Sequence, residues 1–440
     1  MDNSKITRLV SSLKILKSII SPLTAFFVGT ALTCCAYALL TSILGLRMAE
    51  AKVSTFTAGI VLSLYYLGYI IASKTSNKVI NKVGHIRAFS AYISIFSAIA
   101  LLHYFSQSPI YWAILRMLAG YCMGSAFMCL ESWLNTRANN NNRGLLMSLY
   151  MVTSYLGASS GQLLLNIPDA NGITIYIVVS IIFSLALVPV SLTALPSPAI
   201  EVHKSMSLKR LYNISPIGVV GCLCSGVFVG TFYSLGAIYA TQIGLDVKMT
   251  SLFMFFGVLG GLLIQFPLGR LSDKMDRRFV IMWVASILFF IAPWVHFWLG
   301  NSTIMLAICA MFLGAGTFII YPISVSHVND LIDDEDRVNA SGMMIMLQSI
   351  GMILGPIIIS FFMGKLGAVC FALAYSLTTA IFVIFAFKHI SFKPDVGYKN
   401  ITPTALMPID TTHAFHELAT DDKLSTFSKI KQALLQRTRR

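Results

Sequence analysis

The residues best able to do chemistry in this chain are the few charged or titratable side chains that interrupt long apolar segments. Arg116 lies seven residues into the apolar segment 109–131, and Glu131 lies at the far end of the same segment. A charge at mid-membrane costs on the order of 2.5–3.5 kcal/mol on insertion scales, so such a residue indicates function. Arg116 therefore predicts either attraction of an anionic solute group or a gate that bonds helix carbonyls. The alternative is a structural tie between the first and fourth apolar segments.

Glu131 and His327 are the two candidates for proton coupling. Fifteen residues separate Arg116 from Glu131, roughly 22 Å along a helix, so the two cannot pair directly. We expect Glu131 to pair with the loop cations Lys78 or Arg87 as part of a gate. The alternative for Glu131 is proton transfer, because a carboxyl group in an apolar site can hold its proton near neutrality. His327 lies 196 residues after Glu131 and could carry protons as well, or act only as a structural hydrogen-bond partner.

Several polar or aromatic side chains fall near the middle of apolar segments and could contact a solute. Each could equally be a packed side chain with one hydrogen bond. They are Tyr37, Tyr66, Gln162, Tyr233, Gln265, Tyr321 and Gln348.

No metal, cofactor or enzymatic centre is predicted. The acidic run 330–336 indicates a solvated loop whose carboxylates favour the start of the next helix, and it lacks EF-hand spacing. The eight cysteines form no metal-type Cys-x-x-Cys pair. The chain contains no phosphate-binding loop of the G-x-x-x-x-G-K-[S/T] type, so ATP is not expected to drive the protein directly.

The elements that must position these residues are membrane helices. Apolar residues make up 56% of the 440 and charged residues 11%, against about 25% charged residues in soluble domains. The apolar runs are continuous and long enough to cross about 30 Å of hydrocarbon as helices. We predict twelve spans, at 20–46, 56–73, 86–105, 109–131, 143–165, 174–195, 214–243, 250–269, 279–299, 303–326, 339–362 and 368–388.

Basic residues gather on one side of this predicted topology. The net charge of +14 is therefore explained by orientation in a membrane, and nucleic acid is not an expected partner. One face receives Arg47, Lys52, Lys248 and Lys365, whereas the other receives most remaining cations, among them Lys74, Lys78, Lys82, Arg87, Arg143, Arg270 and Lys274. The positive-inside rule makes the second face cytoplasmic, with both termini inside.

The spans divide into two sets of six, separated by a polar stretch. We expect a cytoplasmic segment at 1–19, a six-helix bundle at 20–195, a linker at 196–213, a second bundle at 214–388 and a basic tail at 389–440. The tail has apolar residues at roughly helical spacing. It could form a surface helix on anionic lipid, or be a cytosolic tail without a role in transport.

Two stretches about two hundred residues apart look like copies of one loop. The second runs from Pro267 to Arg278 and contains Gly269, Leu271, Asp273, Lys274, Arg277 and Arg278. The first, at 73–87, has Ser73 in place of the glycine and Asn77 in place of the acid, but keeps Lys78, Gly84 and Arg87. Duplicated membrane halves are how many secondary transporters are built.

The later loop closely resembles the loop signature of the major facilitator superfamily. Arg116-x-x-x-Gly120 resembles that superfamily's fourth-span motif, and the stretches Glu131–Asn135, Arg143-Gly144 and Tyr155–Gly157 resemble its bacterial YcaD-type branch. The resemblance covers most of the chain except both tails. It implies an all-α protein of twelve transmembrane helices in two pseudo-symmetric bundles, with a solute cavity between them and alternating access.

The resemblance also implies an inner gate. It would be formed by Asp273 near the start of the fifth span at Arg143, and by Asn77 near the start of the eleventh span. The remaining expected gate residues are Gly269, Lys274, Arg277, Arg278, Lys78, Arg87 and Glu131. A carboxylate at a helix start is favoured by the helix dipole by about 0.3–1 kcal/mol when exposed. Asn77 lacks the charge, so the two latches are expected to differ in strength.

The expected function is secondary active or facilitative transport of a small polar or anionic solute across the bacterial cytoplasmic membrane. The expected partners are that solute, membrane lipid and, as a candidate coupling ion, protons, for a monomeric protein. Two alternatives stay open. One is drug or metabolite efflux, which is disfavoured because Gln162 stands where exporters of this kind carry a proline. The other is a membrane sensor without transport on the same fold.

Overall fold

The computed structural model describes residues 23–137, 142–169, 172–192, 206–298 and 302–390. These residues form thirteen α-helices and one short 3₁₀ turn. The helices are α2 (Thr24–Glu50), α3 (Thr55–Val83), α4 (His85–Leu102), α5 (Pro109–Arg137), α6 (Arg143–Leu163), α7 (Thr174–Ser191), α8 (Leu208–Ile214), α9 (Pro216–Gln242), α10 (Val247–Ser272), α11 (Arg277–Trp298), α12 (Thr303–Asn329), α13 (Asp334–Leu366) and α14 (Val369–Ile390), with the turn η2 (Leu164–Asn166) after α6.

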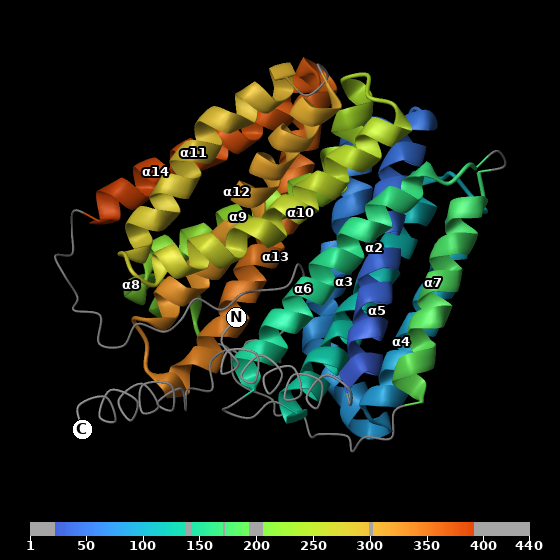
Figure 1. The fold of residues 1–440 in the computed structure, drawn as a ribbon, viewed down its shortest axis with the longest axis horizontal. Coiled ribbons are helices and arrows are strands. Elements are labelled where there is room, and N and C mark those ends of the chain that lie inside the picture. The colour runs from blue at the N-terminus through green and yellow to red at the C-terminus, as the bar shows by residue number, and fades with distance from the viewer. Residues whose placement is uncertain (1–22, 138–141, 170–171, 193–205, 299–301, 391–440) are drawn as a thin grey trace, which may run out of the picture.

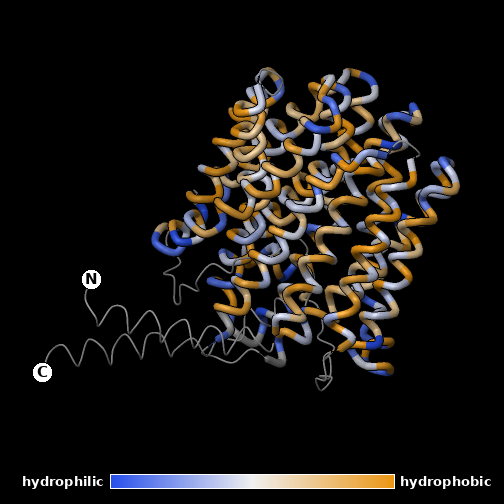
Figure 2. The backbone as a smooth tube through the Cα atoms, turned by 45° about the vertical axis from the view of Figure 1, so that its right-hand side comes forward, coloured by the Kyte–Doolittle hydropathy of each residue, from blue (hydrophilic) through white to orange (hydrophobic). Residues whose placement is uncertain are grey.

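Twelve of these helices are long and one, α8, has seven residues. Eleven of the long helices have the length and apolar composition needed to cross a membrane. The twelfth, α6, is more polar, but it packs beside α2 and α10 inside the bundle. Figure 2 shows apolar colour along the helices and hydrophilic colour gathered at their ends. The predicted all-α membrane fold of twelve spans is confirmed.

The helices form two bundles with the same internal packing (Figure 1). Helices α2 to α7 make the N-terminal half, and α9 to α14 make the C-terminal half. In the first half α3 packs on α5 and α2 packs on α6 and α7. In the second half α10 packs on α12, and α9 packs on α13 and α14. The repeat inferred from the two loop copies thus extends through the whole fold.

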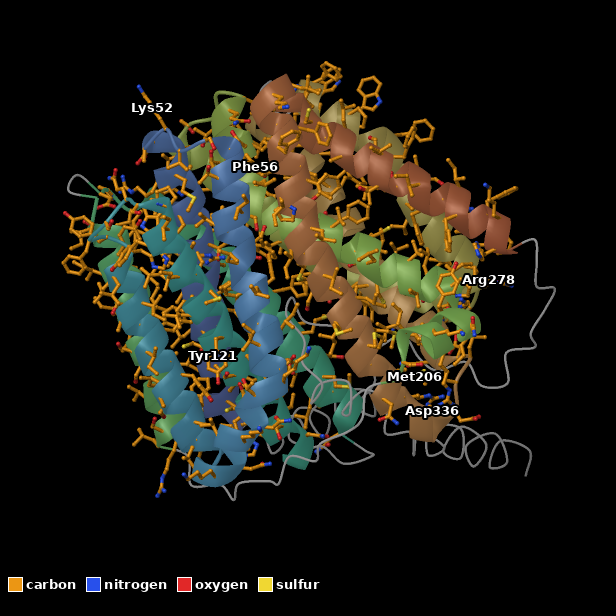
Figure 3. All side chains as sticks on the ribbon, turned by 180° about the vertical axis from the view of Figure 1, so that it is seen from behind. Lys52, Phe56, Tyr121, Met206, Arg278 and Asp336 are labelled. Atoms are coloured by element: carbon orange, nitrogen blue, oxygen red, sulfur yellow. The ribbon has the colours of Figure 1, made fainter. Side chains whose placement is uncertain are left out.

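The two ends of the bundle differ in charge and in how the halves meet. The "basic end" carries the turns at 84, 273–276 and 330–333, and the "opposite end" carries those at 51–54, 243–246 and 367–368. Figure 3 shows the halves together near Lys52 and Phe56, at the opposite end, and diverging toward the end marked by Met206 and Asp336. The structure therefore has one closed end and one at which the halves stand apart.

Glycines allow the closest helix crossings. A Cβ on Gly120 of α5 would overlap the carbonyl oxygen of Tyr65 in α3. In the other half, a Cβ on Gly314 of α12 would overlap the carbonyl oxygen of Gly257 in α10. Small residues let helix backbones approach in lipid, where packing replaces the hydrophobic effect between helices. These crossings hold α5 and α12, which carry Arg116 and His327, against their neighbours.

Two helix boundaries and the linker depart from the expectations. Helix α3 continues to Val83, well past the predicted end at residue 73, and turns at Gly84 with φ of 87°. Helix α13 starts at Asp334, before the predicted start at 339. The expected linker contains a helix, α8, which is joined to α13 by a bond from Met206 N to the carbonyl of Asn339 and by the Arg210–Asp336 ion pair. The segment 1–19 and the tail from 391 lie outside the described residues.

We expect Gly314→Ala to lower the melting temperature of the purified protein clearly, because the added methyl group must displace the backbone of Gly257. The matched control is Gly364→Ala, whose new Cβ would meet only the Thr55 side chain, at 3.9 Å. Thermal unfolding in detergent measures both. Equal melting temperatures for the two variants would contradict the packing described here.

Candidate functional site

Arg116 is fully enclosed by protein and lacks a counter-charge. Its side chain is 1% exposed, and its Nε and Nη1 atoms have no hydrogen-bond partner. The guanidinium carbon lies 4.7 Å from the centre of the Tyr65 ring, which gives a cation–π contact. The ionisable side chains that interact electrostatically with this guanidinium are Tyr37, Tyr65, Tyr66 and His103. Within the described part of the chain, no carboxylate neutralises it.

An aromatic cluster leads from Arg116 across the boundary between the halves. Tyr37 of α2 stacks on Tyr65, with ring centres 5.0 Å apart. The Tyr37 ring lies 6.3 Å from that of Tyr233, which belongs to α9 in the other half. Tyr233 in turn contacts Phe318 of α12 at 5.8 Å. Three predicted site residues, Arg116, Tyr37 and Tyr233, are therefore connected, and Tyr66 adjoins them through Tyr65.

Tyr65, Phe318 and His103 belong to this region but were not among the predicted site residues. Tyr65 is adjacent to Tyr66 in the sequence. Because both are tyrosines, the sequence does not reveal which of them contacts Arg116. His103 follows the end of α4, is 1% exposed, and has no hydrogen-bond partner for Nε2. Its nearness to Arg116 depends on how α4 and α5 pack, which helical spacing does not reveal.

The predicted solute contacts Gln162 and Gln265 form bonds between helices in this structure. Gln162 Oε1 accepts a bond of 2.6 Å from Ser42 of α2, and its Nε2 donates to the carbonyl of Ala38 at 3.4 Å. Gln265 Nε2 donates to the Tyr155 hydroxyl across the halves at 2.6 Å. Tyr321 and Gln348 are buried in the C-terminal half. Solute contact by any of these four residues stays a prediction.

Glu131 is buried and accepts a hydrogen bond within its own half. The Tyr150 hydroxyl of α6 donates to Glu131 Oε1 at 3.1 Å, whereas the expected cations Lys78 and Arg87 are exposed on α3 and α4. His327 is 4% exposed and its Nδ1 has no hydrogen-bond partner. The two candidates thus occupy corresponding helices, α5 and α12, near the basic end, and their part in proton coupling stays a prediction.

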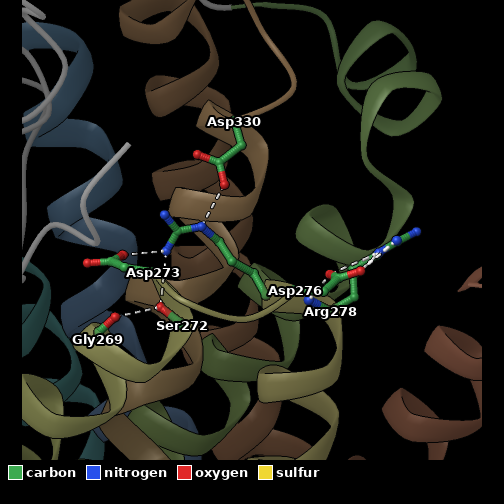
Figure 4. A network of polar contacts seen from close by, with 7 residues as sticks. Gly269, Ser272, Asp273, Asp276, Arg278 and Asp330 are labelled. Carbon is green, nitrogen blue, oxygen red and sulfur yellow. Dashed lines mark hydrogen bonds and ion pairs between the residues drawn. The ribbon is translucent and has the colours of Figure 1, made fainter. Parts of the chain in front are cut away.

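A buried ionic network joins three helix ends of the C-terminal half at the basic end (Figure 4). Arg277 Nε donates to Asp330 Oδ2 at 2.6 Å, and both side chains are 1% exposed. Arg277 Nη1 also contacts Ser272 Oγ at 3.0 Å and Asp273 Oδ1 at 3.1 Å. The Ser272 hydroxyl donates in turn to the Gly269 carbonyl. The loop signature therefore ties the end of α10 to the start of α11 and the end of α12.

The other expected gate residues are distributed around this network and its first-half copy. Arg278 pairs with Asp276 at 2.6 Å, and Lys274 is exposed. Asn77 Oδ1 is buried without a hydrogen-bond partner, and its approach to the start of α13 stays a prediction. Arg143 begins α6, but its side chain lies outside the described residues. The contact between Asp273 and Arg143 stays a prediction.

Polar contacts join the halves at the opposite end. Ser251 of α10 donates to the carbonyl of Gln162 at 2.7 Å and accepts from Asn166 at 2.9 Å. Gln242 of α9 donates to Thr55 of α3 at 2.9 Å. These neutral bonds, formed at helix ends, can be broken and remade without exposing a buried charge. They hold the two halves together at the opposite end.

A separate hollow of about 260 Å³ lies between α10, α11 and α12 in the C-terminal half. Its walls include Ile264, Leu268, Trp283, Ile287 and Phe312. Because these side chains are apolar, they could not orient a polar solute. The hollow does not include Arg116 or the aromatic cluster.

Comparison with protein families gives one match over nearly the whole described chain. The family model of the Major Facilitator Superfamily matches residues 26–264 and 219–424. The chain is also similar to the uncharacterized MFS-type transporter YcaD of several Escherichia coli strains, among them O139:H28 and O9:H4. The identity is 26% over 346 residues, covering 76% of this chain and 87% of the relative.

Two solved transporter structures have the same fold. The nucleoside transporter NupG superposes with a TM-score of 0.69 at 13% identity, covering 85% of this chain and 100% of that one. A bacterial homolog of the human lysosomal transporter Spinster, inward-facing and unoccupied, gives 0.63 at 14% identity, covering 85% and 96%. At these identities the likeness establishes the fold.

We expect Asp330→Ala to destabilise the protein strongly, because it removes the acceptor of Arg277 Nε and weakens the pairing of a buried charge. Breaking a buried pair in this way typically costs about 3–5 kcal/mol. The control is Asp276→Ala, which breaks the Arg278 pair at the same 2.6 Å; because that pair is more exposed, the cost should be about 1 kcal/mol or less. Thermal unfolding compares the two, and a larger loss for Asp276→Ala would contradict the structural importance of Arg277.

Proposed function

Because the chain belongs to the Major Facilitator Superfamily, we propose that it carries a small polar or anionic solute across the bacterial cytoplasmic membrane by alternating access. The protein acts as a membrane transporter without enzymatic chemistry and works as a monomer. Transport is secondary active or facilitative, with protons as the candidate coupling ion.

The observation that carries the preference for an anion is the unneutralised charge of Arg116. A buried guanidinium without a counter-charge is costly, and a single cation–π contact offsets only about 2 kcal/mol of that cost. The tyrosine side chains around Arg116 are neutral, so they stabilise its positive charge only weakly. An anionic group brought by the solute removes the remaining cost, and this gain in free energy favours binding at that place.

The arrangement of the halves supports alternating access. The polar contacts that join them at the opposite end are neutral and few, and the halves diverge toward the basic end (Figure 3). The positive-inside rule places the basic end in the cytoplasm, which makes this the inward-facing arrangement. Rocking of the halves would open the gate of Ser251, Gln242 and Thr55. On the inner side, Asp273 would approach the start of α6 at Arg143, and Asn77 would approach the start of α13.

We expect anions to raise the melting temperature of the purified protein and of an Arg270→Gln control, but not of Arg116→Gln. Arg270 also lies over an aromatic ring, that of Phe266 at 4.0 Å. It is exposed, however, and belongs to the last turn of α10 in the other half. A ligand at a hundred times its Kd stabilises by about 2.7 kcal/mol. The measurement is a thermal-shift screen of anionic, neutral and cationic metabolites.

The same screen can overturn the anion site or the transport function. If only neutral or cationic compounds stabilise the protein, equally in Arg116→Gln, Arg116 is not a solute ligand. Compounds that bind are then tested for flux in proteoliposomes. Binding without flux would favour a sensor over a transporter.

A second expectation concerns the gate at the basic end. Asp273→Asn removes the charge that the helix dipole of α6 would stabilise when the gate closes, so transport of a compound found in the screen should slow markedly at unchanged expression. Asp276→Asn, in the same turn, serves as the control and should transport normally. Unchanged flux in Asp273→Asn would remove this carboxylate from the gate.

A further inference from the structure

We infer that the solute is a flat aromatic molecule with one carboxylate, held with its charge at Arg116 and its ring between Tyr37 and Tyr233. This inference rests on the proposed transport function and narrows its solute class. It follows from the charge around Arg116, from the walls beside it, and from the position of two of those walls on different halves.

The charge balance calls for a single negative group. Arg116 is the one cation of the aromatic cluster, and its Nε and Nη1 atoms are buried without partners. The neighbouring imidazole of His103, also buried with an unpartnered Nε2, cannot neutralise a guanidinium. Glu131 is on the same helix but about 22 Å away along its axis. A monocarboxylate supplies the missing negative charge and accepts hydrogen bonds from the N–H groups of Nε and Nη1.

The walls of the site favour a ring over a sugar or an aliphatic chain. Tyr65 covers one face of the guanidinium, and Tyr37 stacks on Tyr65. Beyond the boundary, Tyr233 contacts Phe318 at 5.8 Å, and Phe318 contacts Tyr155 of the first half at 5.7 Å. Aromatic pairs gain energy beyond the burial of area. Besides Arg116, the hydrogen-bonding groups of this cluster are tyrosine hydroxyls at the rims of aromatic rings, so an aromatic solute gains more from these walls than a polyhydroxylated one.

The pair Tyr37–Tyr233 links ring binding to movement of the halves. Tyr37 belongs to α2 and Tyr233 to α9, and their rings are 6.3 Å apart and tilted by 49°. An inserted ring would sit at van der Waals distance from each, about 3.5–4 Å per contact, so the halves must shift to admit it. Binding of an aromatic solute between them would therefore favour one relative position of the two bundles.

The test uses four probes on the full-length protein: benzoate, 2-naphthoate, cyclohexanecarboxylate and benzamide. The first two are aromatic anions, the third is an anion with a saturated ring, and the fourth has the ring without the charge. Affinity is measured by thermal shift and calorimetry, and uptake is measured in proteoliposomes. We expect the aromatic acids to bind at least about threefold tighter than cyclohexanecarboxylate, and benzamide to bind weakest.

Three test variants and one control separate ring recognition from charge recognition. Tyr37→Leu should abolish the preference of benzoate over cyclohexanecarboxylate while keeping the binding of both anions. Tyr37→Phe should keep the preference, and Tyr104→Leu, which alters an exposed tyrosine at the opposite end, serves as the control. Arg116→Gln should remove the binding of all three acids. If Tyr37→Leu fails to fold, Tyr233→Leu tests the other wall of the same position.

The outcomes distinguish failure of this inference from failure of the proposed function. Equal affinity for benzoate, 2-naphthoate and cyclohexanecarboxylate, unaffected by Tyr37→Leu, would overturn the aromatic class and leave the anion site intact. Benzamide binding as tightly as benzoate, unchanged in Arg116→Gln, would overturn the anion site itself. No binding of either aromatic acid at millimolar concentration, while other anions bind at Arg116, would also overturn the aromatic class.

Discussion

One buried positive charge, which meets no counter-charge among the described residues, constrains this protein more than any other feature. Arg116 lies where α3 and α5 cross most closely, at the crossing that Gly120 makes possible. Its contact with Tyr65 and the stacking of Tyr37 upon Tyr65 fix the walls around it. A charge in this position is costly for a protein that never meets an anion. In the proposed function, the same cost becomes a source of affinity and selectivity for an anion.

The two-fold repeat explains the arrangement of the helices, and the differences between its two halves indicate that they have different roles. Corresponding helices pack on one another in both halves. The cation is in the first half, whereas the buried ionic network of Arg277, Asp330 and Asp273 is in the second. The copy of the loop in the first half offers Asn77, whose Oδ1 has no partner. The C-terminal half therefore has the firmly tied basic end, and the N-terminal half carries the residue that we propose recognises charge.

Much of the fold could be predicted from the sequence because lipid allows few solutions. Continuous apolar runs had to be helices, and the copied loop around Asp273 indicated the repeat. Boundaries such as the extension of α3 to Val83 could not be predicted, because helices continue beyond the hydrocarbon into water without an apolar pattern to mark them.

The site was harder to predict than the fold. Arg116 was identifiable because a charge in an apolar span is rare. The partners of polar residues were not, because they depend on packing: Gln162 bonds Ser42 and Ala38 between helices, and Glu131 accepts from Tyr150. Tyr65 was overlooked beside Tyr66, since two adjacent tyrosines on a helix point in different directions and only the packing of α5 shows which one meets the guanidinium.

The most direct measurement is the location of 4-bromobenzoate in crystals of the protein by the anomalous scattering of bromine. The account predicts a bromine peak beside Tyr37 and Tyr233, with the carboxylate within hydrogen-bond distance of Arg116 Nε or Nη1. A peak only in the apolar hollow between α10, α11 and α12, or an Arg116 neutralised by a protein carboxylate in the bound state, would contradict it.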